Sequence, residues 1–305
     1  MESAETLRAW LRTLAAADRG ERRFGARQHH YRLAAPLGEE RVRAIENALE
    51  LRLPDDYRAY VTETADGGAG PYHGLLPLDH PVQRGCMRGT FAFTAPDDAV
   101  DCDDDGASAD ERGEASESGR GHEARVGERG EAKRARAVYA GVIGLGHVGC
   151  GQMALLVVRG EAAGEVWLDA REAEAGVGPI APSFGAYLED WVERTSRNEL
   201  PRAIVPPGRC ALPNALSAYL ARHEDARGLA RGTIGGEWLR AALAALGPHA
   251  IAVTASRGGP FFDRDQRLDP CPSCEQLLEN LRAQGLAADT VSHGVPPIPA
   301  RTSDA

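Results

Sequence analysis

The stretch from Leu51 to Asp79 constrains the fold more than any other part of the chain. It reads LRLPDDYRAYVTETADGGAGPYHGLLPLD. Pro54 fixes the chain direction, and Asp55 or Asp56 is placed to cap the helix that follows. Apolar residues then recur at helical spacing until the Gly67–Gly68 pair, where a glycine-rich turn ends the helix. The stretch predicts a helix, a tight turn and a short strand, and it holds no nucleophile–base pair.

The order of these elements resembles the SUKH superfamily, also called the Smi1/Knr4 fold. The resemblance is carried by Leu53-Pro54-Asp55-Asp56-Tyr57, by Gly67-Gly68-Ala69-Gly70-Pro71-Tyr72-His73-Gly74-Leu75, by the stretch from Gly149 to Asp169, and by a closing helix from Ser183 to Trp191. It covers roughly residues 30 to 195. It implies an α+β fold with helices packed on a mostly antiparallel sheet. Most bacterial members are thought to be immunity proteins that bind and neutralise toxins, so it also implies a protein partner.

Length, charge and cysteine usage narrow the class of protein. A chain of 305 residues favours two domains over one. A net charge of −10 disfavours binding of nucleic acid over the whole surface. We see no signal peptide and no apolar run that approaches a membrane span. Without a secretion signal, the six cysteines are expected to be cytosolic thiols or metal ligands, so a cytoplasmic protein without disulfides is predicted.

A charged segment interrupts the first domain, which we expect to span residues 1–200. Residues 97–117 contain ten acidic residues and only one basic residue, Arg112, a balance of −9. Residues 118–136 are rich in glycine and carry mixed charge. Such a composition cannot bury enough apolar surface to offset its ordering entropy, so we predict a disordered insertion over 97–136. Its aspartates from Asp101 to Asp105 lack the glycine and terminal glutamate of an EF-hand loop, which argues against calcium.

The pattern Gly144-x-Gly146-x-x-Gly149 is a literal dinucleotide fingerprint, but its context is wrong. A strand is predicted at 138–143, and the fingerprint then needs a helix directly after the third glycine. Gly151 follows instead, and the next apolar run predicts a β-hairpin over about 153–159 and 165–170. We therefore reject a nucleotide site.

The other elements expected in the first domain are amphipathic helices at 3–17, 38–51 and 183–197.

The second domain is predicted to start after a proline-rich linker at 201–209 and to span 210–295, followed by a flexible tail at 296–305. We expect helices at 212–220 and 238–246, a strand at 249–256, a helix after Cys274 and a final strand near 286–291. Pro270-Cys271-Pro272-Ser273-Cys274 at a helix start is a metal half-site, because the helix N-terminus stabilises thiolates and the spacing turns both sulfurs toward one ion.

This half-site resembles the second half of the zinc-deaminase signature, and Gly208-Arg209-Cys210-Ala211 resembles the opening of YwqJ-like deaminases found in toxin systems. The resemblance implies a smaller α/β deaminase-like domain in which Cys210, Cys271 and Cys274 bind zinc. Cys86, Cys102 and Cys150 are expected to be buried or incidental. An alternative to the zinc site is that Cys271 and Cys274 are simple thiols.

The deaminase resemblance breaks down at the proton carrier. The family has a glutamate where this chain has Leu212, and leucine cannot pass a proton from zinc-bound water to the leaving ammonia. Glu237 could serve as the proton carrier, but no metal ligand stands two positions before it. His223 could serve as a ligand, but Asp225 stands where the motif needs the glutamate. We therefore expect a degenerate domain with no catalytic residues, Glu237 being catalytic only if the deaminase is active.

Three functions stay open from the sequence. The first is an immunity protein that binds a toxin domain and carries a degenerate second module. The second is an active zinc-dependent deaminase of nucleobases or nucleic acid. The third is a scaffold or regulatory protein that forms stable complexes without neutralising a toxin.

Overall fold

The computed structural model describes residues 4–96, 137–203, 211–222, 236–255, 259–263, 265–292 and 294. The predicted insertion at 97–136, all of the linker except 201–203, and the tail lie outside these ranges. In chain order the elements are α1 (Ala4–Ala17), α2 (Ala26–His29), α3 (Glu39–Leu49), α4 (Asp55–Ala59), the π-helical turn η1 (Tyr60–Thr64), α5 (Pro81–Cys86), β1 (Val142–Gly149), β2 (Gln152–Val157), β3 (Val166–Asp169), the 3-10 turn η2 (Arg171–Ala173), β4 (Val177–Ala181), α7 (Phe184–Ser196), α8 (Ala211–Ala221), α10 (Gly236–Ala244), β5 (Ile251–Thr254), β6 (Arg267–Leu268), α11 (Pro272–Arg282) and β7 (Val291–Ser292).

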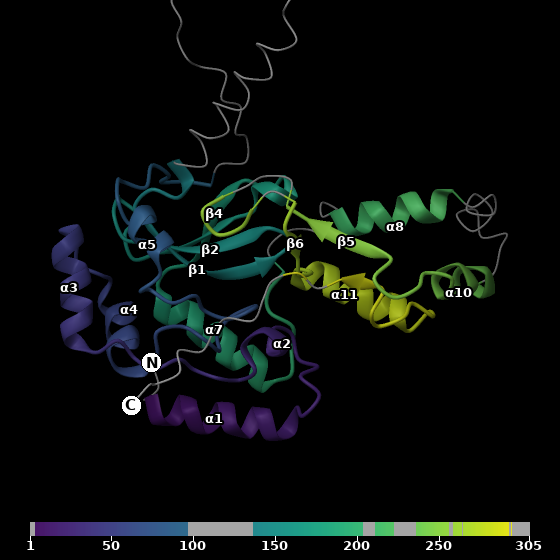
Figure 1. The fold of residues 1–305 in the computed structure, drawn as a ribbon, viewed down its shortest axis with the longest axis horizontal. Helices are drawn as coiled ribbons and strands as arrows, with labels where there is room; N and C mark the ends of the chain where they lie inside the picture. Colours follow the sequence, from purple (N-terminus) through teal and green to yellow (C-terminus); the bar gives the residue numbers. More distant parts are fainter. Residues whose placement is uncertain are drawn as a thin grey trace, which may run out of the picture.

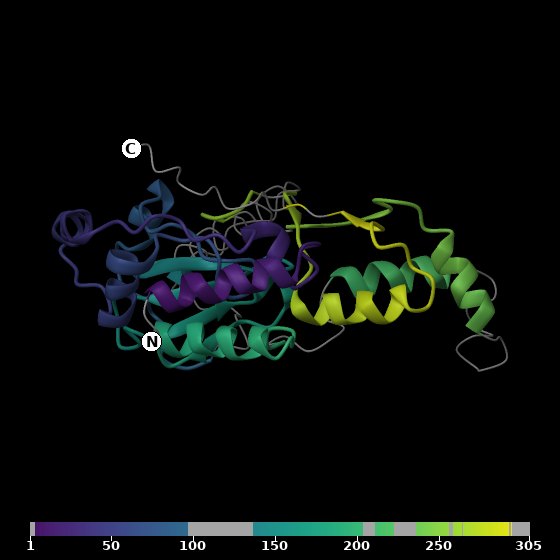
Figure 2. The same ribbon diagram turned by 90° about the horizontal axis from the view of Figure 1, so that it is seen from below.

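The centre of the molecule is an antiparallel sheet of four strands in the order β1-β2-β3-β4. Residues of β1, β2 and β3 are buried throughout, so helices and loops cover both faces of this region of the sheet. Figures 1 and 2 show α3 and α4 at one end of the sheet and α8, α10 and α11 extending from the other. The expected α+β architecture with a mostly antiparallel sheet is confirmed.

The end of the stretch from Leu51 to Asp79 lies along the outer edge of β1. The backbone N–H of His73 donates to the His147 carbonyl at 3.3 Å, and that of Leu76 donates to the Leu145 carbonyl at 2.7 Å. These bonds satisfy an edge that would otherwise offer unpaired backbone groups to another chain. The glycine-rich turn is therefore the cover of the sheet edge.

The predicted helices at 3–17, 38–51 and 183–197 are confirmed as α1, α3 and α7. Ser183 caps α7 as expected, because its hydroxyl accepts the backbone N–H of Ala186 at 3.2 Å. The predicted hairpin is confirmed as β2 and β3, which pair antiparallel. A strand and not a helix follows Gly149, which agrees with the rejection of a nucleotide site.

Three local expectations are wrong. The strand predicted at 138–143 begins only at Val142, because Gly141 has φ +70° and turns the chain. The final strand near 286–291 shrinks to β7, since the backbone N–H of Thr290 turns back to the Ala287 carbonyl. Neither Asp55 nor Asp56 caps α4, whose N-cap is Pro54.

The C-terminal region contains a second sheet in the order β6-β5-β7, antiparallel between β5 and β6 and parallel between β5 and β7. The helices predicted at 212–220, 238–246 and after Cys274 are confirmed as α8, α10 and α11. Buried apolar residues of both regions belong to one contiguous core. The boundary between the two predicted domains stays a prediction. None of the helices in the described ranges has the length and hydropathy of a membrane span.

Candidate metal centre and neighbouring groove

Three cysteines meet where the turn between β1 and β2 lies against the start of α11. Cys150 is in that turn, while Cys271 is the N-cap of α11 and Cys274 lies in its first turn. Their three sulfur atoms all lie within 4.8 Å of one another, and the Sγ atoms of Cys150 and Cys274 are 3.6 Å apart. All three side chains are at most 5% exposed. The group could hold a metal ion.

The backbone holds these sulfurs in place from both sides. The N–H of Cys150 donates to the Asp269 carbonyl at 2.7 Å, and the N–H of Cys271 donates to the Cys150 Sγ at 3.3 Å. Cys150 itself has φ +51°, an uncommon conformation for a residue with a side chain. Nearby, the Nε2 of His73 donates to the Pro270 carbonyl at 3.1 Å. Segments far apart in the sequence therefore fix one another here.

Gly149 allows this close approach. Its φ is +105°, and a Cβ placed on it would lie 2.4 Å from the Pro270 oxygen and 2.6 Å from the Cys271 Cα. Gly146 has the same role earlier in β1, where a Cβ would lie 2.1 Å from the Gly74 oxygen. Two glycines of the rejected fingerprint, Gly146 and Gly149, thus admit neighbouring backbone, and the third, Gly144, admits the ring of Phe261.

The structure brings together two of the three sequence-predicted ligands, Cys271 and Cys274. The third, Cys210, lies outside the described residues, as does Cys102. Cys150 joins the group instead, although its place in the sequence predicted no role as a ligand. Only the three-dimensional contact between the β1–β2 turn and α11 reveals it. Cys86 lies apart from the group, and burial raises the pKa of its thiol to about 11.

The residues that decide catalysis occupy different environments. Leu212, at the position of the family glutamate, is fully buried near the start of α8. Glu237, the possible substitute, is exposed in the first turn of α10. His223 lies outside the described residues. No carboxylate among the described residues joins the three sulfurs as a fourth member of the group.

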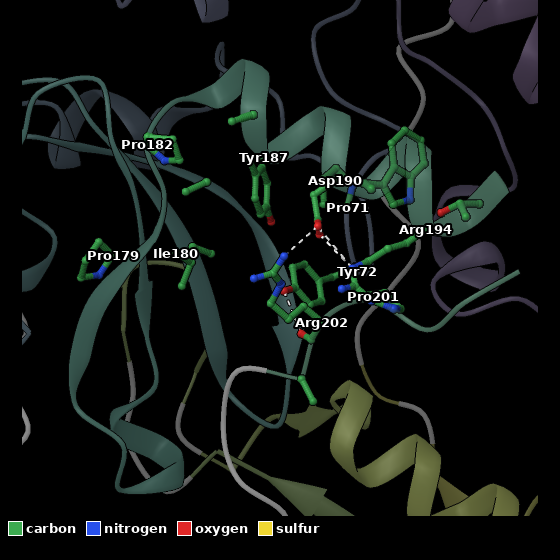
Figure 3. A pocket seen from close by; sticks show the side chains of 15 residues that line it. Pro71, Tyr72, Pro179, Ile180, Pro182, Tyr187, Asp190, Arg194, Pro201 and Arg202 are labelled. Carbon is green, nitrogen blue, oxygen red and sulfur yellow. Dashed lines mark hydrogen bonds and ion pairs between the residues drawn. The ribbon is translucent and has the colours of Figure 1, made fainter. Parts of the chain in front are cut away.

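A groove of about 550 Å³ lies between α7, the end of β4 and the segment that follows α7. Figure 3 shows Tyr187, Asp190 and Arg194 of α7 facing Tyr72 and Arg202 across it. The rings of Tyr72 and Tyr187 stack at 6.2 Å between centroids. The Tyr72 hydroxyl donates to the Arg202 carbonyl at 3.1 Å, and burial raises the pKa of that hydroxyl, so it stays a donor at neutral pH.

Charged side chains close one side of this groove. The carboxylate of Asp190 accepts from Arg194 at 3.3 Å and from Arg202 at 3.1 Å. The Arg202 side chain is 64% exposed, so it can turn toward a partner at little cost. Tyrosine, tryptophan and arginine are the residues most enriched at protein–protein hot spots. Residues of these types line the groove, namely Tyr72, Tyr187, Trp191, Arg194 and Arg202.

Comparison with known families identifies the first part of the chain. The sequence model of the SMI1 / KNR4 family (SUKH-1) matches residues 36–190, which contain the antiparallel sheet and most of the helices around it. The chain belongs to the SMI1/KNR4 family. No curated protein and no solved structure matches it. The C-terminal region lies outside the matched range.

Proposed function

We propose that this protein is a cytosolic immunity protein that neutralises a toxin by binding it directly. The match of residues 36–190 to the SMI1/KNR4 family carries the proposal, because this family is known for immunity proteins of toxin systems. Direct binding needs no covalent chemistry. Affinity comes from a few buried or half-buried anchors and from complementary charge.

The groove beside α7 is the surface that fits this role best. It combines the rings of Tyr72 and Tyr187 with the exposed guanidinium of Arg202, all within or just after the matched family region. A toxin segment with an aromatic or acidic side chain would find both an apolar wall and a charged rim there.

Co-expression with toxins encoded beside this gene tests the proposal. A cognate toxin should arrest growth when it is expressed alone, and this chain should restore growth and co-purify with it. Arg202→Glu should weaken the complex at least tenfold in Kd, which corresponds to about 1.4 kcal/mol. Arg197→Glu is the matched control, because Arg197 lies at the C-terminal end of α7 shortly before Arg202, its side chain is 60% exposed, and it does not line the groove. Absence of rescue with every adjacent toxin would refute the function.

The acidic segment at 97–117 supports a further element of the proposal, namely that a basic toxin is steered toward the protein. Ten acidic residues attract a cationic surface at distances set by the salt concentration. Deleting 97–117 should slow association at low salt and leave dissociation nearly unchanged. Stopped-flow measurements at two salt concentrations distinguish the two rates, and an unchanged association rate would end the steering idea.

An active zinc-dependent deaminase is the alternative function. It would use zinc on Cys210, Cys271 and Cys274, with Glu237 as the proton carrier. Two observations support the binding protein over this enzyme: Glu237 is exposed, whereas Cys271 and Cys274 are each 1% exposed. The substrate nucleobase must reach both the metal-bound water and the proton carrier. Ammonia release from cytosine or adenine bases, abolished by Glu237→Gln, would favour the enzyme.

A further inference from the structure

We propose that Cys150, Cys271 and Cys274 bind one zinc ion as thiolates, and that this ion fastens the C-terminal segment to the β1–β2 turn of the SUKH sheet. The site joins residues more than 120 positions apart. It differs from a deaminase centre, because one ligand comes from the family domain itself. The proposal does not depend on which partner the protein binds.

The distances between the sulfurs fit a metal ion. Zinc–thiolate bonds of about 2.3 Å in a tetrahedral arrangement place the sulfurs about 3.8 Å apart. The Sγ atoms of Cys150 and Cys274 are 3.6 Å apart, and no pair in the group exceeds 4.8 Å. A disulfide needs about 2.05 Å and involves only two sulfurs. Three converging thiols therefore fit one cation better than a covalent bridge.

The surroundings favour thiolates over thiols. Cys271 and Cys274 occupy the N-terminus of α11, an 11-residue helix whose dipole stabilises negative charge. The backbone N–H of Cys271 also points at the Cys150 sulfur, and such bonds stabilise and orient metal-bound thiolates. Binding releases the thiol protons to solvent. Soft sulfur donors favour zinc among the common divalent cations.

The role of the ion is structural, because the three sulfurs are too deeply buried to receive a substrate. The Cys150 N–H bond to Asp269 and the contact of Gly149 with Pro270 already align the two segments. A metal ion would add a link that the unfolded chain does not have, so its binding free energy would appear as stability of the docked C-terminal segment.

The experiment uses the full chain, purified without chelators and then supplied with zinc. Elemental analysis should find one zinc ion per chain. Cys150→Ser should lose it, whereas Cys86→Ser, which removes another buried thiol away from the group, should keep it. If zinc sits instead on Cys210, Cys271 and Cys274 alone, Cys150→Ser keeps the ion, and that result overturns the proposal.

A second measurement on the unaltered chain covers the case in which the variants do not fold. Zinc X-ray absorption should show at least three sulfur neighbours at about 2.3 Å. Cobalt replacement should give the intense charge-transfer absorption of several thiolate ligands. Fewer than three sulfurs, no bound zinc, or a disulfide between Cys150 and Cys274 in freshly isolated protein would each overturn the proposal.

Discussion

The side-chain amide of Gln83 pairs with both backbone groups of Gly144. Its Nε2 donates to the Gly144 carbonyl at 2.8 Å, and its Oε1 accepts the Gly144 N–H at 2.9 Å. Gln83 lies in α5 and is fully buried. Through these two hydrogen bonds its side chain pairs with the edge of β1 as a residue of a neighbouring strand would. One side chain thus satisfies the edge of β1 at Gly144, beyond the point where Leu76 makes its backbone bond to Leu145.

Gln83→Glu keeps the shape of this side chain but removes the donor. A carboxylate would face the Gly144 carbonyl, so we expect a loss of about 1–3 kcal/mol in the free energy of unfolding. Urea titration followed by fluorescence measures the change. Gln276→Glu, an exposed change on α11, is the control and should stay within about 0.5 kcal/mol of the wild type. Equal stability of both variants would contradict the buried pairing.

Gly149→Ala tests the contact between the β1–β2 turn and Pro270. The added methyl group would overlap the Pro270 oxygen, and the residue would also keep a left-handed φ of +105°. Gly164→Ala carries a similar φ of +100° but meets nothing within 4 Å, so it reports the backbone strain alone, about 1–2 kcal/mol. Gly149→Ala should destabilise more than this control and should expose the C-terminal segment to limited proteolysis. Identical proteolysis patterns would count against the contact.

The buried imidazole of His29 makes stability depend on pH. Burial lowers its pKa to about 3, with His73 and His30 adding to the effect, and its Nδ1 accepts the backbone N–H of Tyr31 at 3.0 Å. The unfolded chain, with a pKa of about 6.5, binds the proton more readily than the folded one. Stability is therefore fully present above pH 6.5 and falls as the pH drops toward 3, by about 1.4 kcal/mol per pH unit.

His29→Asn keeps an acceptor for the Tyr31 N–H and removes the titration. Its unfolding free energy should fall less steeply between pH 6.5 and 4.5 than that of the wild type. His147, whose pKa burial lowers to about 4, keeps some of the slope in both proteins. His249→Asn is an exposed control in a left-handed position that asparagine tolerates, and it should leave the slope unchanged. Parallel slopes in all three proteins would disprove the assignment.

Asp56 links the start of α7 to the start of its own helix, because its Oδ1 accepts the backbone N–H of Tyr57 in α4 at 2.8 Å. Its Oδ2 accepts the backbone N–H of Gly185 at 2.7 Å, across 129 positions of sequence. Asp56→Ala should therefore cost about 1–2 kcal/mol, as the loss of a helix cap does. Asp55→Ala is the adjacent control, because the Asp55 side chain is 82% exposed and pairs only with Arg52 in the described region. Thermal unfolding of the two variants compares the aspartate that links α4 to α7 with its exposed neighbour, and equal unfolding temperatures would contradict the link.

Sequence patterns predicted the elements whose signals are local. The helix α7 was predictable nearly to the residue, because Ser183 caps it and its apolar residues lie at helical spacing. The α+β class and the hairpin of β2 and β3 followed in the same way. The π-helical turn after Ala59 was not predictable. It depends on a hydrogen bond from the Ala65 N–H to the Tyr60 carbonyl, which joins residues five positions apart.

Only two of the three cysteines in the candidate site were predictable, for a related reason. Cys271 and Cys274 carry a recognisable spacing at a helix start. Cys150 becomes their neighbour through the fold of a turn that no spacing rule describes. The bond from Asp56 to the start of α7 was missed for the same cause, since its partner Gly185 is distant in sequence. Tertiary contacts, and not local propensity, decide such positions.

The close packing of Pro270 and Cys271 against Gly149 bears on how this protein can be divided for study. An expression fragment that stops near residue 190, where the family match ends, would strip the cover from the β1–β2 turn. The thiol of Cys150 and the apolar residues beside it would then meet solvent and oxidants. A fragment that keeps this turn covered therefore has to extend beyond the family match, through Pro270 and Cys271.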